Sequence, residues 1–129
     1  MFSILESALR ELVEEAPLGI FLADNNGIIM MANSAMVTIF GYSRFELVGK
    51  KMEMLMPEAQ RGEHVQHRAQ FFQSPTKRQM GVGLHIQGQR KDGSLVDLEI
   101  KICTIETSEG VLSGAFIMDK TAAQRLGEK

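Results

Sequence analysis

The chain has 129 residues, of which 44% are hydrophobic and 23% are charged, and its formal net charge is −2. A chain of this length and composition folds as one globular domain, which excludes a mostly disordered protein. The sequence lacks the concentrated basic clusters of nucleic-acid-binding domains, so we do not expect it to bind nucleic acid. No apolar run reaches the roughly 18 residues of a membrane span, so we expect no membrane contact by this domain.

The first predicted element is a helix over residues 3–15. Its apolar side chains recur with helical spacing, and its charged side chains lie on the opposite side. The apolar positions are Ile4, Leu5, Ala8, Leu9, Leu12 and Val13. Such a helix needs an apolar surface to cover. Pro17 ends it, because the residue before a proline disfavours helical backbone.

A β-hairpin is expected next. Two short apolar runs, at residues 18–24 and 28–33, flank the polar segment Asn25–Gly27. An Asn-Gly pair between two such runs is a strong signal for a tight hairpin turn.

Two short helices follow the hairpin. Asn33–Ser34 can cap a helix over residues 35–40, which Gly41 ends. Ser43–Glu46 fits a capping box, in which the serine and the glutamate each satisfy a backbone amide of the first turn. We expect this second helix to stop at Gly49.

A third helix is expected after a connector over residues 52–57. Pro57–Glu58 favours a helix start, because proline costs nothing at a first helical position and acids favour the N-terminal end of the helix dipole. The buried stripe of this helix would consist of Val65, Ala69 and Phe72. His64 lies at the border of that stripe and is the first candidate for a ligand contact.

The pattern of apolar residues in the last third of the chain predicts three strands. Apolar residues alternate with polar ones over residues 79–87 and again over 96–103, and the turn Lys91–Gly93 joins the two runs. Residues 111–118 are a third apolar run, whose faces the alternation does not assign. Five antiparallel strands with the helices grouped in mid-sequence predict an α+β domain with the helices on one face of the sheet.

The chain resembles the PAS sensory domain family over residues 16–121. Eight stretches match in the family's order and spacing. They are Ala16–Ile20, Asp24–Gly27, Ala32–Asn33, Phe40–Ser43, Glu46–Gly49, Met56–Pro57, Arg90–Ser94 and Asp119–Thr121. The resemblance implies a five-stranded antiparallel sheet in the order 2-1-5-4-3 with a helical layer that encloses a pocket.

By the same resemblance, the chain is a signal-input domain of a larger signalling protein, such as one of a two-component system. Residues 1–15 would form a cap helix that covers the outer face of the sheet and pairs with its copy in a homodimer, with packing inside one chain as the alternative. Residues 16–121 would form the sensory domain, and 122–129 would begin a connector to an effector domain. The sequence contains no phosphate loop or nucleophile motif, so we expect a regulatory domain and not an enzyme. A single cysteine, Cys103, suits the reducing cytoplasm.

A narrower resemblance concerns the region around His64. Residues 57–64, with 81–93, are similar to the haem-binding PAS domains of oxygen-sensing nitrogen-fixation kinases and their phosphodiesterase relatives. In those domains the histidine at the position of His64 is the proximal ligand of the haem iron. The walls of the pocket would include Val82, Leu84, Ile100 and Ile102. Where those families place a distal arginine or methionine, this sequence has Leu84 and Val82, so bound oxygen would lack a hydrogen-bond donor.

Three alternatives stay open from the sequence. His64 can be a structural or surface histidine of its helix. The pocket can be filled by methionine and leucine side chains of the domain itself, which would make it a cofactor-free dimerisation module. Cys103 lacks the Asn-Cys-Arg context of flavin-photoreactive PAS domains, which leaves non-covalent FAD or FMN as the flavin option.

Overall fold

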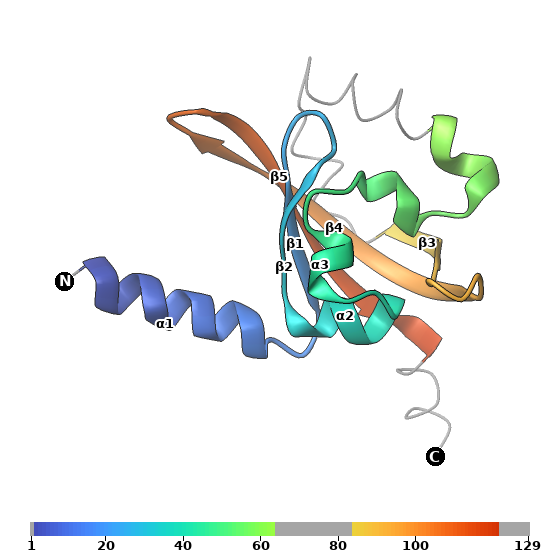
Figure 1. Cartoon of the computed structure of the whole chain (residues 1–129), viewed down its shortest axis with the longest axis horizontal. Helices are drawn as coiled ribbons and strands as arrows, with labels where there is room; N and C mark the ends of the chain where they lie inside the picture. The colour runs from blue at the N-terminus through green and yellow to red at the C-terminus, as the bar shows by residue number, and fades with distance from the viewer. Residues whose placement is uncertain (1, 64–83, 122–129) are drawn as a thin grey trace.

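The computed structural model describes residues 2–63 and 84–121, and its centre is an antiparallel sheet (Figure 1). Five strands lie in the order β2-β1-β5-β4-β3. Their bounds are Gly19–Ala23 for β1, Ile29–Ala32 for β2, Leu84–Gln89 for β3, Leu95–Thr107 for β4 and Gly110–Asp119 for β5. The predicted α+β class and the predicted strand order are confirmed.

The short helices cover one face of this sheet, as predicted. They are α2 (Ser34–Phe40), α3 (Arg44–Leu47) and the 3-10 helices η1 (Met52–Leu55) and η2 (Glu58–Gln60). The N-terminal helix α1 (Phe2–Glu15) projects from the side of the domain (Figure 1). Within the described part of the chain, no helix is long and apolar enough to cross a membrane.

Local sequence signals explain where the helices begin and end. The Asn33 side chain caps α2 by accepting a hydrogen bond from the Met36 amide, and Gly41 ends this helix in the left-handed conformation at φ 79°. Ser43 and Glu46 form the predicted capping box at the start of α3. These caps satisfy amide groups that a helix start leaves without a partner.

The inner face of the sheet and the short helices share one apolar core. The buried apolar residues are Phe21, Ala23, Ile29, Ala32, Met36, Ile39, Phe40, Leu47, Leu55, Val96, Leu98, Ala115 and Ile117. The faces of β5, which its apolar sequence left unassigned, are now defined. Ala115 and Ile117 are buried on the inner side, whereas Phe116 and Met118 are exposed on the outer side.

Three predicted segments differ in detail from the structure. The first strand of the long hairpin continues to Gln89, two residues beyond its predicted end, and its predicted start at residues 79–83 lies outside the described ranges. The helix expected from Pro57 opens instead with the 3-10 turn η2, because the Gln60 amide donates to the Pro57 carbonyl three residues back. The connector predicted at 52–57 contains the 3-10 helix η1 for the same kind of reason, since the Met56 amide donates to the Glu53 carbonyl.

α1 has the predicted amphipathic pattern, but most of its apolar stripe is exposed in the described structure. Ile4, Leu5, Leu9 and Leu12 are all exposed. The helix lies beside α2 and does not lie across the outer face of the sheet (Figure 1). In the part of the chain that the structure describes, these four side chains remain exposed.

The close approach of β3 to the helices yields a stability prediction at Gly88. A Cβ atom at this position would lie 2.7 Å from Leu98 Cδ1, 3.0 Å from Phe40 Cε1 and 3.2 Å from the Leu55 carbonyl oxygen. We expect Gly88→Ala to lower the free energy of unfolding by about 1–3 kcal/mol through overpacking. Urea denaturation measures this change.

The matched control is Gly62→Ala, because nothing lies within 4 Å of a Cβ atom built at Gly62. There the added methyl group restricts the unfolded chain and should leave stability equal or raise it by about 0.4–1 kcal/mol. Equal effects at the two glycines would show that the contacts around Gly88 are looser than described.

Candidate functional site

An internal cavity of about 150 Å³ lies between the inner face of the sheet and the helical layer. Strands β1, β3, β4 and β5 form one wall, and α2 with the segment around η1 forms the other. The lining residues are Phe21, Phe40, Met52, Leu55, Met56, Ile86, Leu98, Ile100, Ile102, Ala115 and Ile117. Every one of these side chains is apolar.

The cavity contains part of the predicted site. Ile100 and Ile102 line it, as the alternation along β4 predicted. The backbone of Leu84 pairs with Ile100 at the edge of the sheet. His64 and Val82 lie outside the described residues.

Sequence reasoning missed several lining residues. Met52, Leu55 and Met56 belong to the predicted connector. Their apolar side chains, three to four residues apart, are the sequence signal that this segment packs against the core. Phe40 is predicted as the last residue of a helix and as part of a family-matching stretch, and not as a wall residue of a pocket. These four side chains form the helical wall of the cavity.

The chemistry of the cavity favours binding over catalysis. Its described walls contain no acid, base or nucleophile, so they cannot transfer a proton or form a covalent intermediate. Among the described residues there is also no group of three or more histidine, cysteine or acidic side chains that could hold a metal ion. Apolar cavities on the order of 150 Å³ take up small apolar molecules such as benzene or xenon.

The buried side chain of Asn33 connects α1 to the domain. Its Nδ2 donates to the carbonyl oxygens of Val13 in α1, at 2.8 Å, and of Leu18, at 3.0 Å. Its Oδ1 accepts from the amides of Ile20 in β1, at 2.9 Å, and of Met36 in α2, at 3.2 Å. One carboxamide therefore fixes the end of α1, the start of β1 and the first turn of α2.

Two surface contacts add to this anchor. The Ser34 hydroxyl donates to the Glu14 carbonyl oxygen at 3.1 Å, and Arg44 Nη2 lies 2.6 Å from Glu14 Oε2. Both partners of the ion pair are partly exposed, and such pairs contribute only about 0–1 kcal/mol. The buried amide of Asn33 is the stronger restraint, because losing it leaves backbone groups without partners.

The other end of α2 is tied to the long hairpin. Arg90 Nε donates to the Ile39 carbonyl oxygen at 3.0 Å, and the Lys91 amide donates to the Phe40 carbonyl oxygen at 2.9 Å. The Lys91 ammonium donates to Glu46 Oε2 at 2.6 Å, and this hydrogen bond holds the pKa of the Glu46 carboxyl below its ordinary value. Helix α2 therefore bridges the cavity wall, the hairpin and α1.

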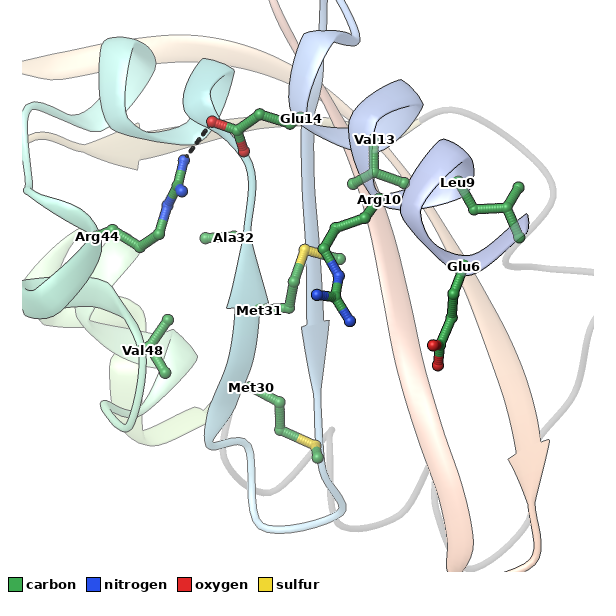
Figure 2. Close-up of a pocket in the computed structure, with 10 residues that line it drawn as sticks. All are labelled: Glu6, Leu9, Arg10, Val13, Glu14, Met30, Met31, Ala32, Arg44 and Val48. Carbon is green, nitrogen blue, oxygen red and sulfur yellow. Dashed lines mark hydrogen bonds and ion pairs between the residues drawn. The ribbon is translucent and has the colours of Figure 1, made fainter. Parts of the chain in front are cut away.

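A second hollow lies on the outside of the domain, between α1 and the edge strand β2 (Figure 2). Its volume is about 440 Å³. The lining residues are Glu6, Leu9, Arg10, Val13, Glu14, Met30, Met31, Ala32, Arg44 and Val48. Unlike the internal cavity, this groove combines an apolar floor with charged side chains on its rim.

Sequence comparisons match the chain to one family model and to two larger proteins. The family model described as "PAS fold" matches residues 7–119. "Sensor protein FixL" of Bradyrhizobium diazoefficiens is 26% identical over 120 residues, which are 93% of this chain and 24% of that protein. "Oxygen sensor protein DosP" of Escherichia coli is 25% identical over 107 residues, which are 83% of this chain and 13% of that protein. The chain thus spans a quarter or less of each relative.

Solved structures with the same fold are similar over most of the chain. The PAS domain of an HTR-like protein from Haloarcula marismortui has a TM-score of 0.76 at 22% identity, covering 92% of this chain and 93% of that one. A PAS domain from a two-component sensor histidine kinase has a TM-score of 0.75 at 14% identity, covering 92% and 99%. At these identities the likeness establishes the fold alone.

The internal cavity predicts how two buried alanines respond to enlargement. Ala115 lines the cavity, whereas Ala23 is fully buried and does not line it. We expect Ala23→Ile to destabilise the domain by about 1–3 kcal/mol through overpacking, and Ala115→Ile to change stability by less than about 1 kcal/mol because its new atoms fill empty space. Thermal and urea denaturation measure both variants. If Ala115→Ile costs as much as Ala23→Ile, the cavity is not open in solution.

Proposed function

This chain belongs to the PAS family, and from that premise we propose that it is the sensory input domain of a larger signal-transduction protein. The observation that carries the proposal is the apolar cavity between the sheet and the helical layer. A ligand in this cavity, or a redox change of a bound group, would favour one arrangement of its walls over another. The resulting population shift is passed to the helices that flank the domain.

The hydrogen bonds of α2 supply a route for this signal. Phe40, at the end of α2, is a wall residue of the cavity. At the start of the same helix, Asn33 binds the Val13 carbonyl oxygen of α1. A displacement of α2 by a ligand would therefore act on the last turn of α1.

The output belongs to an effector domain outside this chain, such as a histidine kinase or a cyclase. The names of the relatives support this, since one is a sensor protein and one fold neighbour comes from a two-component sensor histidine kinase. In this proposal the domain itself is regulatory and not an enzyme. A cytoplasmic location accords with Cys103, which is a free thiol.

Haem is the first candidate for the group in the pocket, with His64 as its axial ligand. Support comes from the motif around His64 and from similarity to an oxygen sensor protein. The apolar walls, with Ile100 and Ile102 and the predicted Val82 and Leu84, suit the faces of a porphyrin. The described cavity, however, has about 150 Å³, below the roughly 300–1,000 Å³ of cofactor sites. Haem does not fit unless these walls separate.

The small volume supports a second candidate, a cofactor-free module whose pocket is filled mainly by its own side chains. Met52, Met56 and Leu55 already occupy the helical side of the cavity. Methionine adapts to irregular spaces, so it suits this role. A non-covalent flavin, FAD or FMN, would need the same enlargement as haem.

A haem titration separates these candidates. Ligation by His64 predicts a Soret band when the protein is expressed with ample iron and haem precursor. The band should be lost in His64→Ala and kept in the control His67→Ala, because His67 lies outside the matching stretch of residues 57–64. A colourless protein that also fails to bind added haem would exclude the haem candidate and favour the cofactor-free module. Absorption bands in the blue region would indicate flavin.

We also propose that the domain forms a homodimer through α1. The apolar side chains of this helix are unusually exposed, with Leu12 at 68% and Ile4 at 76%. An apolar stripe of this kind on a soluble domain marks an interaction surface.

Substitution of Leu12 tests the dimer. Leu12→Glu places a charge in the proposed interface, so we expect a monomer in sedimentation velocity at concentrations where the wild type is dimeric. Ser7→Glu is the control, because Ser7 lies on the polar side of the same helix and should leave the dimer intact. A Leu12→Glu protein that remains dimeric would place the interface elsewhere.

A further inference from the structure

The size of the internal cavity limits what it can hold. Its volume is about 150 Å³, whereas sites for cofactors have roughly 300–1,000 Å³. A porphyrin or a flavin would therefore have to displace wall side chains. A single six-membered ring fits without such a change, because apolar cavities on the order of 150 Å³ hold benzene.

The polar side chains buried in the described structure do not serve the cavity. They are Asn33, Glu53 and Ser113, and none of them is among the described lining residues. Within the ranges 2–63 and 84–121, every buried side-chain nitrogen or oxygen already has a hydrogen-bond partner. A ligand is therefore not needed to satisfy any of these polar atoms.

The backbone of the cavity walls is paired as well. On the sheet side, the wall strands lie in continuous antiparallel ladders, β1 with β5, β5 with β4 and β4 with β3. On the helical side, the Met52 amide donates to the Gly27 carbonyl oxygen at 2.7 Å, and the Met56 carbonyl oxygen accepts from Arg61 Nε at 3.0 Å. A hydroxyl or charged group on a ligand would lose its bonds to water here, which lowers its affinity.

The lining side chains also favour an aromatic ligand. Phe21 and Phe40 are buried wall residues, whereas Met52, Met56 and Ile86 are half-buried and mark the side of the cavity nearest to solvent. Aromatic rings and thioether sulfurs both make favourable contacts with a ring. Methionine is also the most adaptable apolar side chain, so Met52 and Met56 suit the side through which a ligand enters.

We propose that the cavity binds a small neutral aromatic hydrocarbon directly, without haem or flavin. This inference rests on the proposed sensory function and names the class of its ligand. The ring lies against Phe21 and Phe40, and the side chains of Met52 and Met56 cover it. Because Phe40 is the last residue of α2, an occupied cavity favours a different position of this helix.

Three ring compounds test the ligand class by isothermal titration calorimetry on the wild-type protein. Benzene should bind saturably at a single site. Phenol should bind at least about ten-fold more weakly, because its hydroxyl finds no partner in the cavity. Cyclohexane should bind about three-fold more weakly, because it lacks the π-system that contacts sulfur and aromatic edges. No saturable binding of benzene, or phenol binding as tightly as benzene, would overturn the proposal.

Filling the cavity tests whether the ligand binds there. Ala115→Ile should weaken benzene binding at least about ten-fold, because the added atoms occupy the space of the ring. Met118→Ile is the matched control, since Met118 is exposed on the outer side of the same strand and should leave the affinity unchanged. Urea denaturation establishes that both variants fold. Unchanged benzene affinity in a folded Ala115→Ile protein would overturn the site, and the wild-type series stays decisive if this variant does not fold.

The outcomes separate the ligand class from the sensory function on which it rests. A wild-type protein that takes up haem with a Soret band and binds no benzene would overturn this inference and leave the sensory function. Benzene binding with the expected selectivity, and no change in effector output of the full-length protein, would support the ligand class and overturn the sensory function.

Discussion

The placement of the N-terminal helix depends on the buried carboxamide of Asn33. Its two donors and its oxygen are all used, and the four partners come from α1, the segment before β1, β1 itself and α2. Without this side chain, the carbonyl oxygen of Leu18 would lose this hydrogen bond, and that of Val13 would keep the Ala16 amide at 3.3 Å as its donor. Few other contacts hold α1, since its apolar stripe faces solvent.

The same helix that Asn33 caps also closes the internal cavity. α2 begins at the anchor of α1 and ends with Phe40, a cavity wall residue whose carbonyl oxygen accepts from Lys91 of the long hairpin. It has seven residues, so it is a short element between these two points. In the proposed mechanism, this one element connects a change of cavity volume with a change at the end of α1.

Local signals in the sequence predicted most of the fold. The capping box of Ser43 and Glu46, the glycine turn after Asn25 and the alternation along β4 each depend on neighbouring residues, and all three are present. The motif order predicted the sheet topology. These signals could not assign the faces of β5, because an all-apolar run has no period, and only pairing with β1 and β4 decides them.

The candidate site was predicted less completely. Alternation placed Ile100 and Ile102 in the cavity, but the contribution of Met52 and Met56 arises from the way η1 folds over the sheet. The outer groove was not predicted, since it forms between α1 and β2 only when Asn33 fixes the angle of the helix. Amphipathicity indicated that α1 needs a partner surface and gave no position for it.

The central claim is that occupancy of the apolar cavity is communicated to α1 through α2 and Asn33. An NMR titration of the ¹⁵N-labelled protein with benzene, as a small apolar probe, tests it most directly, because cavities on the order of 150 Å³ with apolar walls bind this molecule. The account predicts saturable chemical-shift changes at the amides of Ile100 and Ala115. The amides of Met36, Asn33 and the last turn of α1 should shift with the same dissociation constant. Saturable shifts confined to the cavity residues, with α1 unchanged, would contradict it.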